Sequence, residues 1–243
     1  MTGTARPAFY ALAPGGWRDY VTLLHPPYTL WHLSYVAIGA ALAPHWRPGV
    51  LGLGLLAFFL GMGIAAHALD ELHGRPLVTR IPDTTLVALA AASLAGAAGI
   101  GVAVALRTSL WLLAFVAIGA FIAVAYNLEL FGGRFHGDPW FALAWGAFPV
   151  LATYFAAAET IRVEALLAAA SAAFLSHAQR RLSTPVRLVR RRVLEVTGRI
   201  ELVDGTALPI TSETLAGDTE RALQALSASV ICLAIALVVL RVT

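Results

Sequence analysis

The chain has 243 residues, of which 59% are hydrophobic and only 13% are charged. Soluble proteins carry about 25% charged residues, and the mean hydropathy of this chain is +0.76. These values exclude a soluble globular domain, a disordered chain and a nucleic-acid-binding module, and they predict an integral membrane protein with several spans. All 17 basic residues are Arg, so no Lys side chain is present to form a Schiff base or to act as a general base.

Seven apolar runs, separated by charged residues, Pro and Gly, predict about seven transmembrane helices in a single membrane domain that occupies residues 1–243. The predicted spans are Tyr28–Ala43, Val50–Leu69, Thr84–Leu106, Ser109–Tyr126, Trp140–Ala158, Ala165–His177 and Ala222–Leu240. The first run is short, but Pro26 and Pro27 are well placed to begin its helix. The sixth run is also short, and we expect its helix to continue through Arg180 into water.

The arginines are distributed unequally between the two sides of the membrane. With seven spans, the N-terminus and the loops after the second, fourth and sixth spans share one side. Thirteen arginines fall on that side, and four fall on the other: Arg47, Arg107, Arg162 and Arg241. The positive-inside rule therefore predicts a multi-pass protein of the inner (plasma) membrane with a cytoplasmic N-terminus. The composition, rich in Ala and Arg and without Lys, is typical of a GC-rich prokaryote.

The one sizeable polar stretch of the sequence, residues 183–220, lies between the last two spans. Within it, Pro185–Val196 has the pattern of a basic amphipathic helix that lies on the membrane surface. Residues 198–210 alternate in polarity on either side of Asp204-Gly205, a dipeptide that favours a tight turn. We therefore predict a cytoplasmic insertion that contains a small amphipathic helix and a β-hairpin.

The second span ends in four residues with ligand-capable side chains, His67, Asp70, Glu71 and His73. Ionisable side chains at the edge of the hydrocarbon are costly and are therefore functional candidates. On a helix, His67, Asp70 and Glu71 share one face, and a set of carboxylates and imidazole suits a divalent metal. His73 could join this set from the rim. The alternative is a solvated helix end that binds nothing.

The end of the fourth span and the loop after it form a second polar group. Glu129, His136 and Asp138 could add metal ligands. Tyr126 and Asn127 could hydrogen-bond an anion or a substrate. For Tyr126 the alternative is an interfacial aromatic residue of the kind that is common at membrane surfaces.

The end of the sixth span is cationic. It carries His177, Arg180 and Arg181, and no carboxylate occurs between Glu164 and Glu195. Arginines there could hold a phosphate group through paired hydrogen bonds. The alternative, which we favour for the arginines at 187–192, is contact with lipid headgroups.

Three stretches resemble the UbiA superfamily of intramembrane prenyltransferases. They are Leu23–Tyr28, the end of the second span with Arg75-Pro76 and Arg80-Ile81-Pro82, and Ala125-Tyr126-Asn127 followed by Arg134 and Gly146–Val150. The resemblance covers about residues 20–195. The chain departs from the family in both acidic motifs. At the defining positions of the first motif only Asp70 is acidic, and the second motif, expected at residues 176–185, is absent.

The resemblance implies a UbiA-like helical bundle that binds an isoprenyl or related lipid diphosphate at a cytoplasm-facing pocket and transfers the isoprenyl group to an acceptor. In this interpretation, Asp70, Glu71 and Tyr126 are catalytic. The residues expected to bind substrate are Arg75, Arg80, Asn127, Arg134, His177, Arg180 and Arg181. The expected ligands of a divalent metal, which is Mg²⁺ in the family, are His67, Asp70, Glu71, His73, His136 and Asp138.

Two other functions remain open. A divergent member of the family could carry out other metal-dependent chemistry on a lipid, with His67, Asp70, Glu71, His136 and Asp138 as ligands. A non-catalytic membrane subunit could bind a lipid, quinone or pigment in the same pocket and associate with a membrane-protein partner. The expected ligand is a membrane lipid or an isoprenoid substrate, and we expect no nucleic-acid partner.

Overall fold

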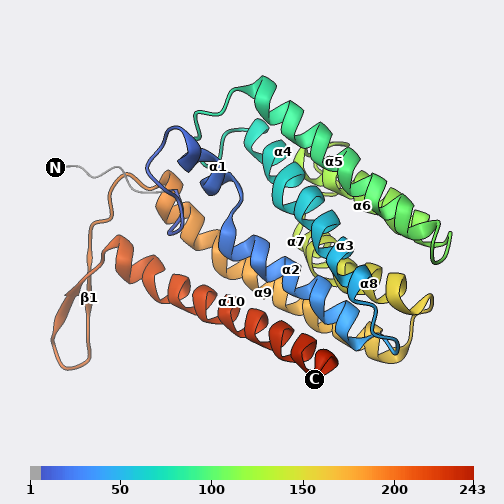
Figure 1. The fold of residues 1–243 in the computed structure, drawn as a ribbon. Helices are drawn as coiled ribbons and strands as arrows, with labels where there is room; N and C mark the ends of the chain where they lie inside the picture. Colours follow the sequence, from blue (N-terminus) through green and yellow to red (C-terminus); the bar gives the residue numbers. More distant parts are fainter. Residues whose placement is uncertain (1–6) are drawn as a thin grey trace.

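The computed structural model describes residues 7–243, and helices make up 72% of it. The long helices run side by side in one bundle, and loops join them at its two ends (Figure 1). In chain order the helices are α1 (Trp17–Leu23), α2 (Pro26–Leu42), α3 (Pro48–Phe58), η1 (Phe59–Ala66), α4 (His67–Leu72), α5 (Asp83–Ala105), α6 (Leu112–Asn127), α7 (Asp138–Phe141), η2 (Ala142–Ala147), α8 (Phe148–Ala158), α9 (Val163–Arg192) and α10 (Ser212–Val242). Two short strands, β1 (Arg199–Glu201) and β2 (Ala207–Pro209), lie between α9 and α10.

Each of the seven predicted spans lies in a helical part of the structure. In residues 7–243, four continuous helices are long and apolar enough to cross a membrane: Pro48–Leu72, Asp83–Ala105, Asp138–Ala158 and Ser212–Val242. The helix α6 is apolar but shorter. The structure therefore has the helical, multi-pass membrane character that the composition predicts.

Two of the long helices widen locally into π-helix. The segment η1 connects α3 to α4, and η2 connects α7 to α8. In each segment a backbone carbonyl lies beside an imidazole: Gly63 O is 3.1 Å from His67 Nδ1, and Trp145 O is 2.7 Å from His32 Nδ1. Because a carbonyl can only accept, both imidazoles carry their proton on Nδ1 when neutral. Short π-helices are frequent at functional sites, and apolar periodicity does not predict them.

One half of the bundle, formed by α2, η2, α8, α9 and α10, is tightly packed, and we call it the packed half. Its core includes Trp31 and Val150, which are completely buried. At two helix crossings the backbones approach so closely that no Cβ atom would fit. A Cβ at Gly39 would lie 2.4 Å from Val150 O, and one at Gly146 would lie 2.5 Å from Ala172 O.

The other half, formed by α3, η1, α4, α5 and α6, is less enclosed, and we call it the open half. Here α5 packs on α3, η1 and α6, and α6 reaches α8 of the packed half. Only 17% of the most apolar stretch of α5 is buried in the protein, compared with 67% for Asp138–Ala158 and 22% for Ser212–Val242, the outer helix of the packed half. Most of α5 is therefore left for lipid to cover.

The helix α9 runs unbroken to Arg192, whereas the sequence predicts a separate surface helix from Pro185. The apolar face of that predicted helix is buried in the protein, because Val186 and Val189 pack against α10. A bidentate ion pair between α9 and α10 lies beside this contact, with Arg190–Glu220 distances of 2.9 and 2.6 Å. The segment continues as helix because α10, and not the membrane surface, covers its apolar side.

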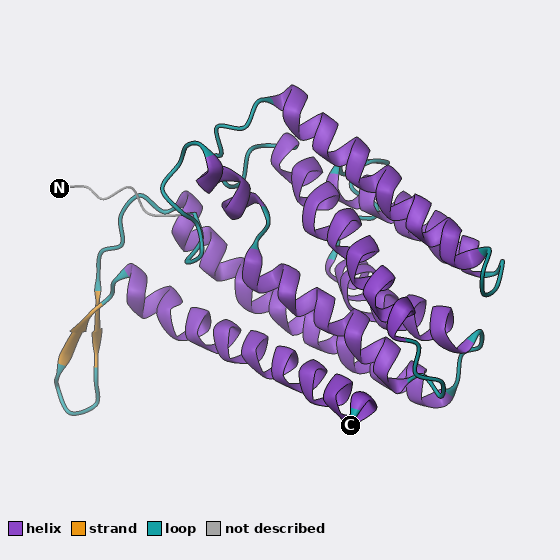
Figure 2. Cartoon of the chain, in the orientation of Figure 1, coloured by secondary structure: helices purple, strands orange, loops and turns teal. Residues whose placement is uncertain are grey.

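The predicted β-hairpin is confirmed. The strands β1 and β2 pair antiparallel, with Ile200 opposite Leu208. The turn between them contains Asp204 and Gly205, and Gly205 adopts a left-handed φ of +85°, which glycine reaches without strain. The hairpin projects from one end of the bundle, beside the start of α10 (Figure 2).

Candidate functional site

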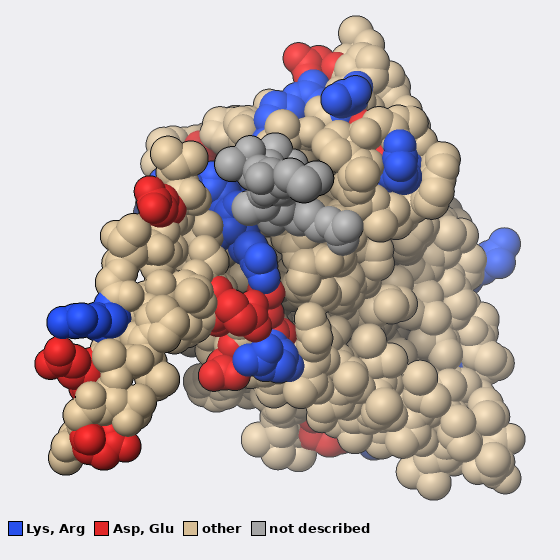
Figure 3. Space-filling model, turned by 90° about the vertical axis from the view of Figure 1, so that its left-hand side faces the viewer, with Lys and Arg blue, Asp and Glu red and all other residues tan. Residues whose placement is uncertain are grey.

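Polar and charged side chains gather at the end of the bundle from which the hairpin projects. Figure 3 views this end of the molecule, and Arg atoms meet Asp or Glu atoms near the middle of the face. Ring contacts, hydrogen bonds and mutual electrostatic effects connect a set of side chains that we call the polar cluster. Its members are Tyr10, His25, Tyr28, His67, Asp70, Tyr126, His136, Arg180, Arg187 and Arg191.

His25 and His67 join the start of α2 to the start of α4 within the polar cluster. Their rings stack with centroids 4.1 Å apart, and Tyr10 Oη lies 3.0 Å from His25 Nδ1. Burial raises the pKa of Tyr10, and burial together with the charge of His67 lowers the pKa of His25 well below its ordinary value. Both Tyr10 and His25 are therefore neutral at pH 7. His25 Nε2 is buried and has no hydrogen-bond partner in the part of the chain that the structure describes.

A second part of the cluster ties α6, α7 and α9 together. His136 Nδ1 lies 3.0 Å from the backbone oxygen of Tyr126, and the two rings lie 4.5 Å apart. Arg180 donates to Asp138 Oδ1 at 2.6 Å and to the Tyr126 hydroxyl. The Arg180 guanidinium also lies over the Phe141 ring, 5.3 Å from its centroid, which is a cation–π contact. The charge of Arg180 is therefore already balanced by Asp138.

The other charges of the cluster belong to Asp70, Arg187 and Arg191. Arg187 donates to Thr184 Oγ1 at 3.1 Å, and Arg191 donates to Pro7 O at 3.1 Å. Within residues 7–243, neither guanidinium has a carboxylate oxygen within 4.0 Å. Asp70 lies within electrostatic reach of both arginines. Within the described residues, this part of the cluster therefore holds two cations and one carboxylate that interact electrostatically without a direct ion pair.

Glu71, a predicted catalytic residue and metal ligand, is occupied by the loop that follows α4. Its side chain is completely buried. It accepts hydrogen bonds from the backbone N–H of Leu77 at 3.0 Å, and from the backbone N–H and the hydroxyl of Thr79 at 2.8 Å each. Both carboxylate oxygens therefore hold residues 73–82 against the end of the helix.

The other predicted substrate-binding residues do not all converge. Arg75 donates to Ile81 O at 2.7 Å and pairs with Asp83, and Asn127 donates to Ala123 O at 2.7 Å. The predicted site residues that are exposed at the surface are His73, Arg80, Arg134, His177 and Arg181. The predicted site residues that lie in the polar cluster are His67, Asp70, Tyr126, His136 and Arg180.

The predicted metal site depends on whether enough ligands converge. Among residues 7–243, no three His, Cys, Asp or Glu side chains are placed to hold a metal ion together. Glu71 is occupied by Leu77 and Thr79, and Asp138 is occupied by Arg180. At this end of the helix, the Asp70 carboxylate and Nε2 of His67 are left as possible metal ligands. The donor set therefore does not fit the carboxylate–imidazole site that the spacing predicts.

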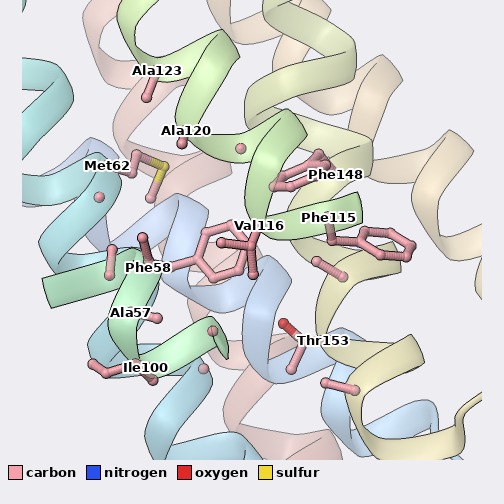
Figure 4. Close-up of a pocket in the computed structure, with 18 of the residues that line it drawn as sticks. Ala57, Phe58, Met62, Ile100, Phe115, Val116, Ala120, Ala123, Phe148 and Thr153 are labelled. Atoms are coloured by element: carbon pink, nitrogen blue, oxygen red, sulfur yellow. The ribbon is translucent and has the colours of Figure 1, made fainter. Parts of the chain in front are cut away.

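An apolar cavity of about 140 Å³, which we call the lumen, lies between α3, η1, α5, α6 and α8. Figure 4 shows alanine side chains and phenylalanine rings around it. The lining residues include Ala57, Phe58, Phe115, Ala120, Ala123 and Phe148. Thr153 also lines the lumen, but its hydroxyl already donates to Pro149 O at 2.9 Å. The lumen therefore offers almost no hydrogen-bonding capacity and suits a hydrocarbon group.

The lumen and the polar cluster meet at Met62, Tyr126 and Trp145. These three side chains pack together, and Met62 and Trp145 also line the lumen. The Tyr126 and Trp145 rings meet edge to face with centroids 5.7 Å apart. Because the Tyr126 hydroxyl accepts from Arg180, Tyr126 has its ring against the lining of the lumen and its oxygen in the polar cluster.

Several members of the polar cluster are not predicted as site residues by the sequence analysis: Tyr10, His25, Tyr28, Arg187 and Arg191. The two arginines could have been identified from helical periodicity, because Arg187 and Arg191 follow Arg180 on one face of a continuous helix. Tyr10 and His25 lie outside every predicted span, and no local pattern marks them.

No family model, curated protein or solved structure matches this chain. The resemblance to the UbiA superfamily accordingly stays a prediction from short stretches of sequence. The polar cluster and the lumen are therefore the two features of the molecule from which a function can be inferred.

Proposed function

We propose that this protein is a UbiA-like intramembrane transferase that acts on an isoprenyl or related lipid diphosphate. The observation that carries the proposal is the contact between the apolar lumen and the polar cluster at Tyr126 and Trp145. A ligand with an anionic head and a hydrocarbon tail needs these two environments side by side. The lumen would take the isoprenyl tail, and the polar cluster would take the diphosphate.

The proposal includes seven membrane crossings, with the N-terminus and the polar cluster on the cytoplasmic side. The helices α2, α6 and the first part of α9 then join the four long apolar helices in the membrane. The unequal distribution of arginines supports this orientation. A Ser212→Cys substitution in a Cys232→Ala background tests it, because the new thiol should react with a membrane-impermeant reagent only from the cytoplasmic side. Labelling only from the outer side would reverse the orientation.

In the proposed reaction, the bond between the allylic carbon and the diphosphate oxygen breaks, and its electron pair leaves with the diphosphate. A nucleophilic carbon of the acceptor bonds to the allylic carbon and then loses a proton. Preorganised donors stabilise the negative charge that develops on the leaving group, and Arg180, Arg187 and Arg191 would supply them. The Asp70 carboxylate accepts no hydrogen bond within residues 7–243 and is the group we assign to receive the proton.

The lumen would protect the allylic cation from water. Its lining is apolar, and three phenylalanine rings lie close together in it, with Phe148 centroids 6.0 Å from Phe58 and 6.1 Å from Phe115. Aromatic faces attract cations, and exclusion of water prevents hydrolysis of a reactive intermediate. These side chains would bind the tail and limit side reactions, while the polar cluster acts on the head.

The experiment uses the full-length protein in lipid nanodiscs, with farnesyl diphosphate as the probe. Binding is measured by calorimetry, and turnover is measured as release of inorganic diphosphate. Ala120→Phe fills the lumen, and Ala117→Phe places the same ring on the exposed side of the same helix. We expect Ala120→Phe to weaken binding at least about tenfold, because each methylene kept out of the lumen forfeits about 0.8 kcal/mol. Equal binding by the two variants would contradict the assignment of the tail to the lumen.

Two other results would favour the other functions. Tight lipid binding without release of diphosphate would favour a non-catalytic subunit that binds a lipid, quinone or pigment. A divalent metal that copurifies with the protein and is lost in Asp70→Asn would favour metal-dependent lipid chemistry, because Asp70 is the predicted carboxylate ligand without an internal partner.

A further inference from the structure

Arg187 and Arg191 lie one helical turn apart on the same face of α9, and both are partly buried in the polar cluster. A guanidinium group carries five N–H donors. Within residues 7–243 each arginine makes one hydrogen bond, from Arg187 to Thr184 Oγ1 and from Arg191 to Pro7 O. Both acceptors are uncharged, so most of the donors and both positive charges are still available to a ligand.

The electrostatic balance around this pair is unfavourable without an anion. Burial and the positive charges of Arg191 and Arg180 lower the pKa of Arg187. The charge of Arg180 is compensated by Asp138, and Asp70 is a carboxylate of the polar cluster on which the charges of Arg191 and Arg187 act. Partly buried cations without a paired anion are costly. The pair therefore has the properties of a preformed anion site.

A third group in the same cluster points to the same kind of ligand. His25 Nε2 is buried without a hydrogen-bond partner in the described part of the chain, and the charges of Arg191 and Arg187 act on this imidazole. When the Tyr10 hydroxyl donates to His25 Nδ1, the neutral ring carries its proton on Nε2. His25 would then offer one further donor to an oxygen of the ligand.

We propose that Arg187 and Arg191 together hold one phosphate group by charge-assisted hydrogen bonds, without a divalent metal. The inference rests on the proposed function and specifies how its head group is bound. Two guanidinium forks match the oxygen geometry and the two negative charges of a phosphate monoester. In the family that the chain resembles, two acidic motifs bind the head group through Mg²⁺. Here the residues of the polar cluster near the missing second motif are arginines, and Glu71 of the first motif is occupied by the loop.

The test measures binding of farnesyl monophosphate to the full-length protein in nanodiscs, in EDTA and in Mg²⁺. We expect the same affinity under both conditions. Farnesol, which has the tail without the phosphate, should bind at least about tenfold more weakly. A requirement for Mg²⁺ would overturn the proposal, and so would equal binding of farnesol.

Substitution of each arginine by Gln assigns the site. We expect Arg187→Gln and Arg191→Gln each to weaken binding of farnesyl monophosphate about tenfold or more. Arg192→Gln is the matched control, because Arg192 is the next residue and is exposed, and it should bind as the wild type does. Arg187→Lys keeps the positive charge but loses the paired N–H donors of the guanidinium, so it should bind with intermediate affinity. It replaces Arg187→Gln as the test if that variant does not fold. Unchanged affinity in the arginine variants would overturn the proposal.

Three results separate this inference from the proposed function. Binding could be independent of metal and dependent on both arginines, while no diphosphate is released from farnesyl diphosphate. This result would support the phosphate site and contradict the transferase. If inorganic phosphate binds as tightly as farnesyl monophosphate, the site binds free phosphate. This result would support the role of the two arginines and contradict a lipid ligand. If turnover requires Mg²⁺ and is unaffected by Arg187→Gln, the result would contradict the phosphate site and support the transferase.

Discussion

The packed half and the open half of the bundle are built from similarly apolar sequence but bury it differently. In the packed half, Gly39 and Gly146 let helices approach until their backbones touch. In the open half, small residues such as Ala57 and Ala120 line a lumen. Small side chains therefore have opposite consequences for helix packing in the two halves. They bring backbones together where two helices cross, and they leave space where four helices surround a common axis.

The polar cluster lies where the two halves meet. His25 comes from the start of α2 in the packed half, and His67 comes from α4 in the open half. Likewise, Arg180 of the packed half donates to Tyr126 of the open half. A ligand held at this junction would contact closely packed helices on one side and the helices around the lumen on the other. The following predictions test how different the two halves are.

The largest effect should come from a methyl group added at the closest helix crossing. In Gly39→Ala the new Cβ would lie 2.4 Å from Val150 O, and because this neighbour is backbone, the helices must separate. We expect a loss of about 3 kcal/mol in the free energy of unfolding. Gly52→Ala in α3 is the control, because nothing lies within 4 Å of its added Cβ, and it should be neutral or slightly stabilising. Thermal unfolding in detergent measures both, and similar values would show that the crossing at Gly39 tolerates a methyl group as well as an open position does.

The next effect separates two adjacent carboxylates in the open half. Glu71→Gln replaces one acceptor oxygen by a donor that faces the N–H groups of Leu77 or Thr79. Leaving a buried donor unsatisfied costs about 1–3 kcal/mol, so the unfolding temperature should fall and residues 73–82 should become sensitive to protease. Asp70→Asn should change neither, because the Asp70 carboxylate accepts no hydrogen bond within residues 7–243. Equal destabilisation by the two substitutions would contradict the structural role of Glu71.

Sequence patterns predict the helices of both halves but not the way the site is assembled. Each predicted span is helical over most of its length, and the hairpin forms around Asp204-Gly205, because apolar length and turn chemistry are local properties. The spacing of His67, Asp70 and Glu71 predicts one shared face, but the loop after α4 captures Glu71. That capture depends on how the loop of residues 73–82 folds back onto the end of the helix, and helical periodicity does not contain this information.

The arginines of α9 show the same limit of prediction from sequence patterns. The sequence pattern from Pro185 is correctly amphipathic, but the pattern does not say which surface covers the apolar side. Because α10 covers it, α9 continues as one helix, and Arg187 and Arg191 lie in the polar cluster. Tertiary packing decides whether a membrane surface or a protein surface covers the apolar side. Because α9 packs against α10, arginines that contribute to the topology prediction lie in a candidate binding site.

The smallest effect concerns pH at the junction of the halves. Burial and the charge of His67 lower the pKa of His25 well below its ordinary value of 6.5. Below about pH 6.5 the unfolded chain therefore binds a proton at His25 that the folded protein does not bind, and the free energy of unfolding should fall as the pH falls. The slope from this one group is at most about 1.4 kcal/mol per pH unit. At higher pH both states are neutral at His25, so its contribution is constant.

The variant that isolates this effect is His25→Asn. His25 has a left-handed φ of 46°, which Asn tolerates better than most residues, so the substitution removes the titrating group without adding backbone strain. Unfolding temperatures measured between pH 7 and pH 5 should decline less in His25→Asn than in the wild type. His45→Asn, at an exposed position outside the polar cluster, should keep the wild-type decline. If His25→Asn declines in parallel with the wild type, the contact between the two halves does not depend on a neutral His25, and the acid sensitivity belongs to another group.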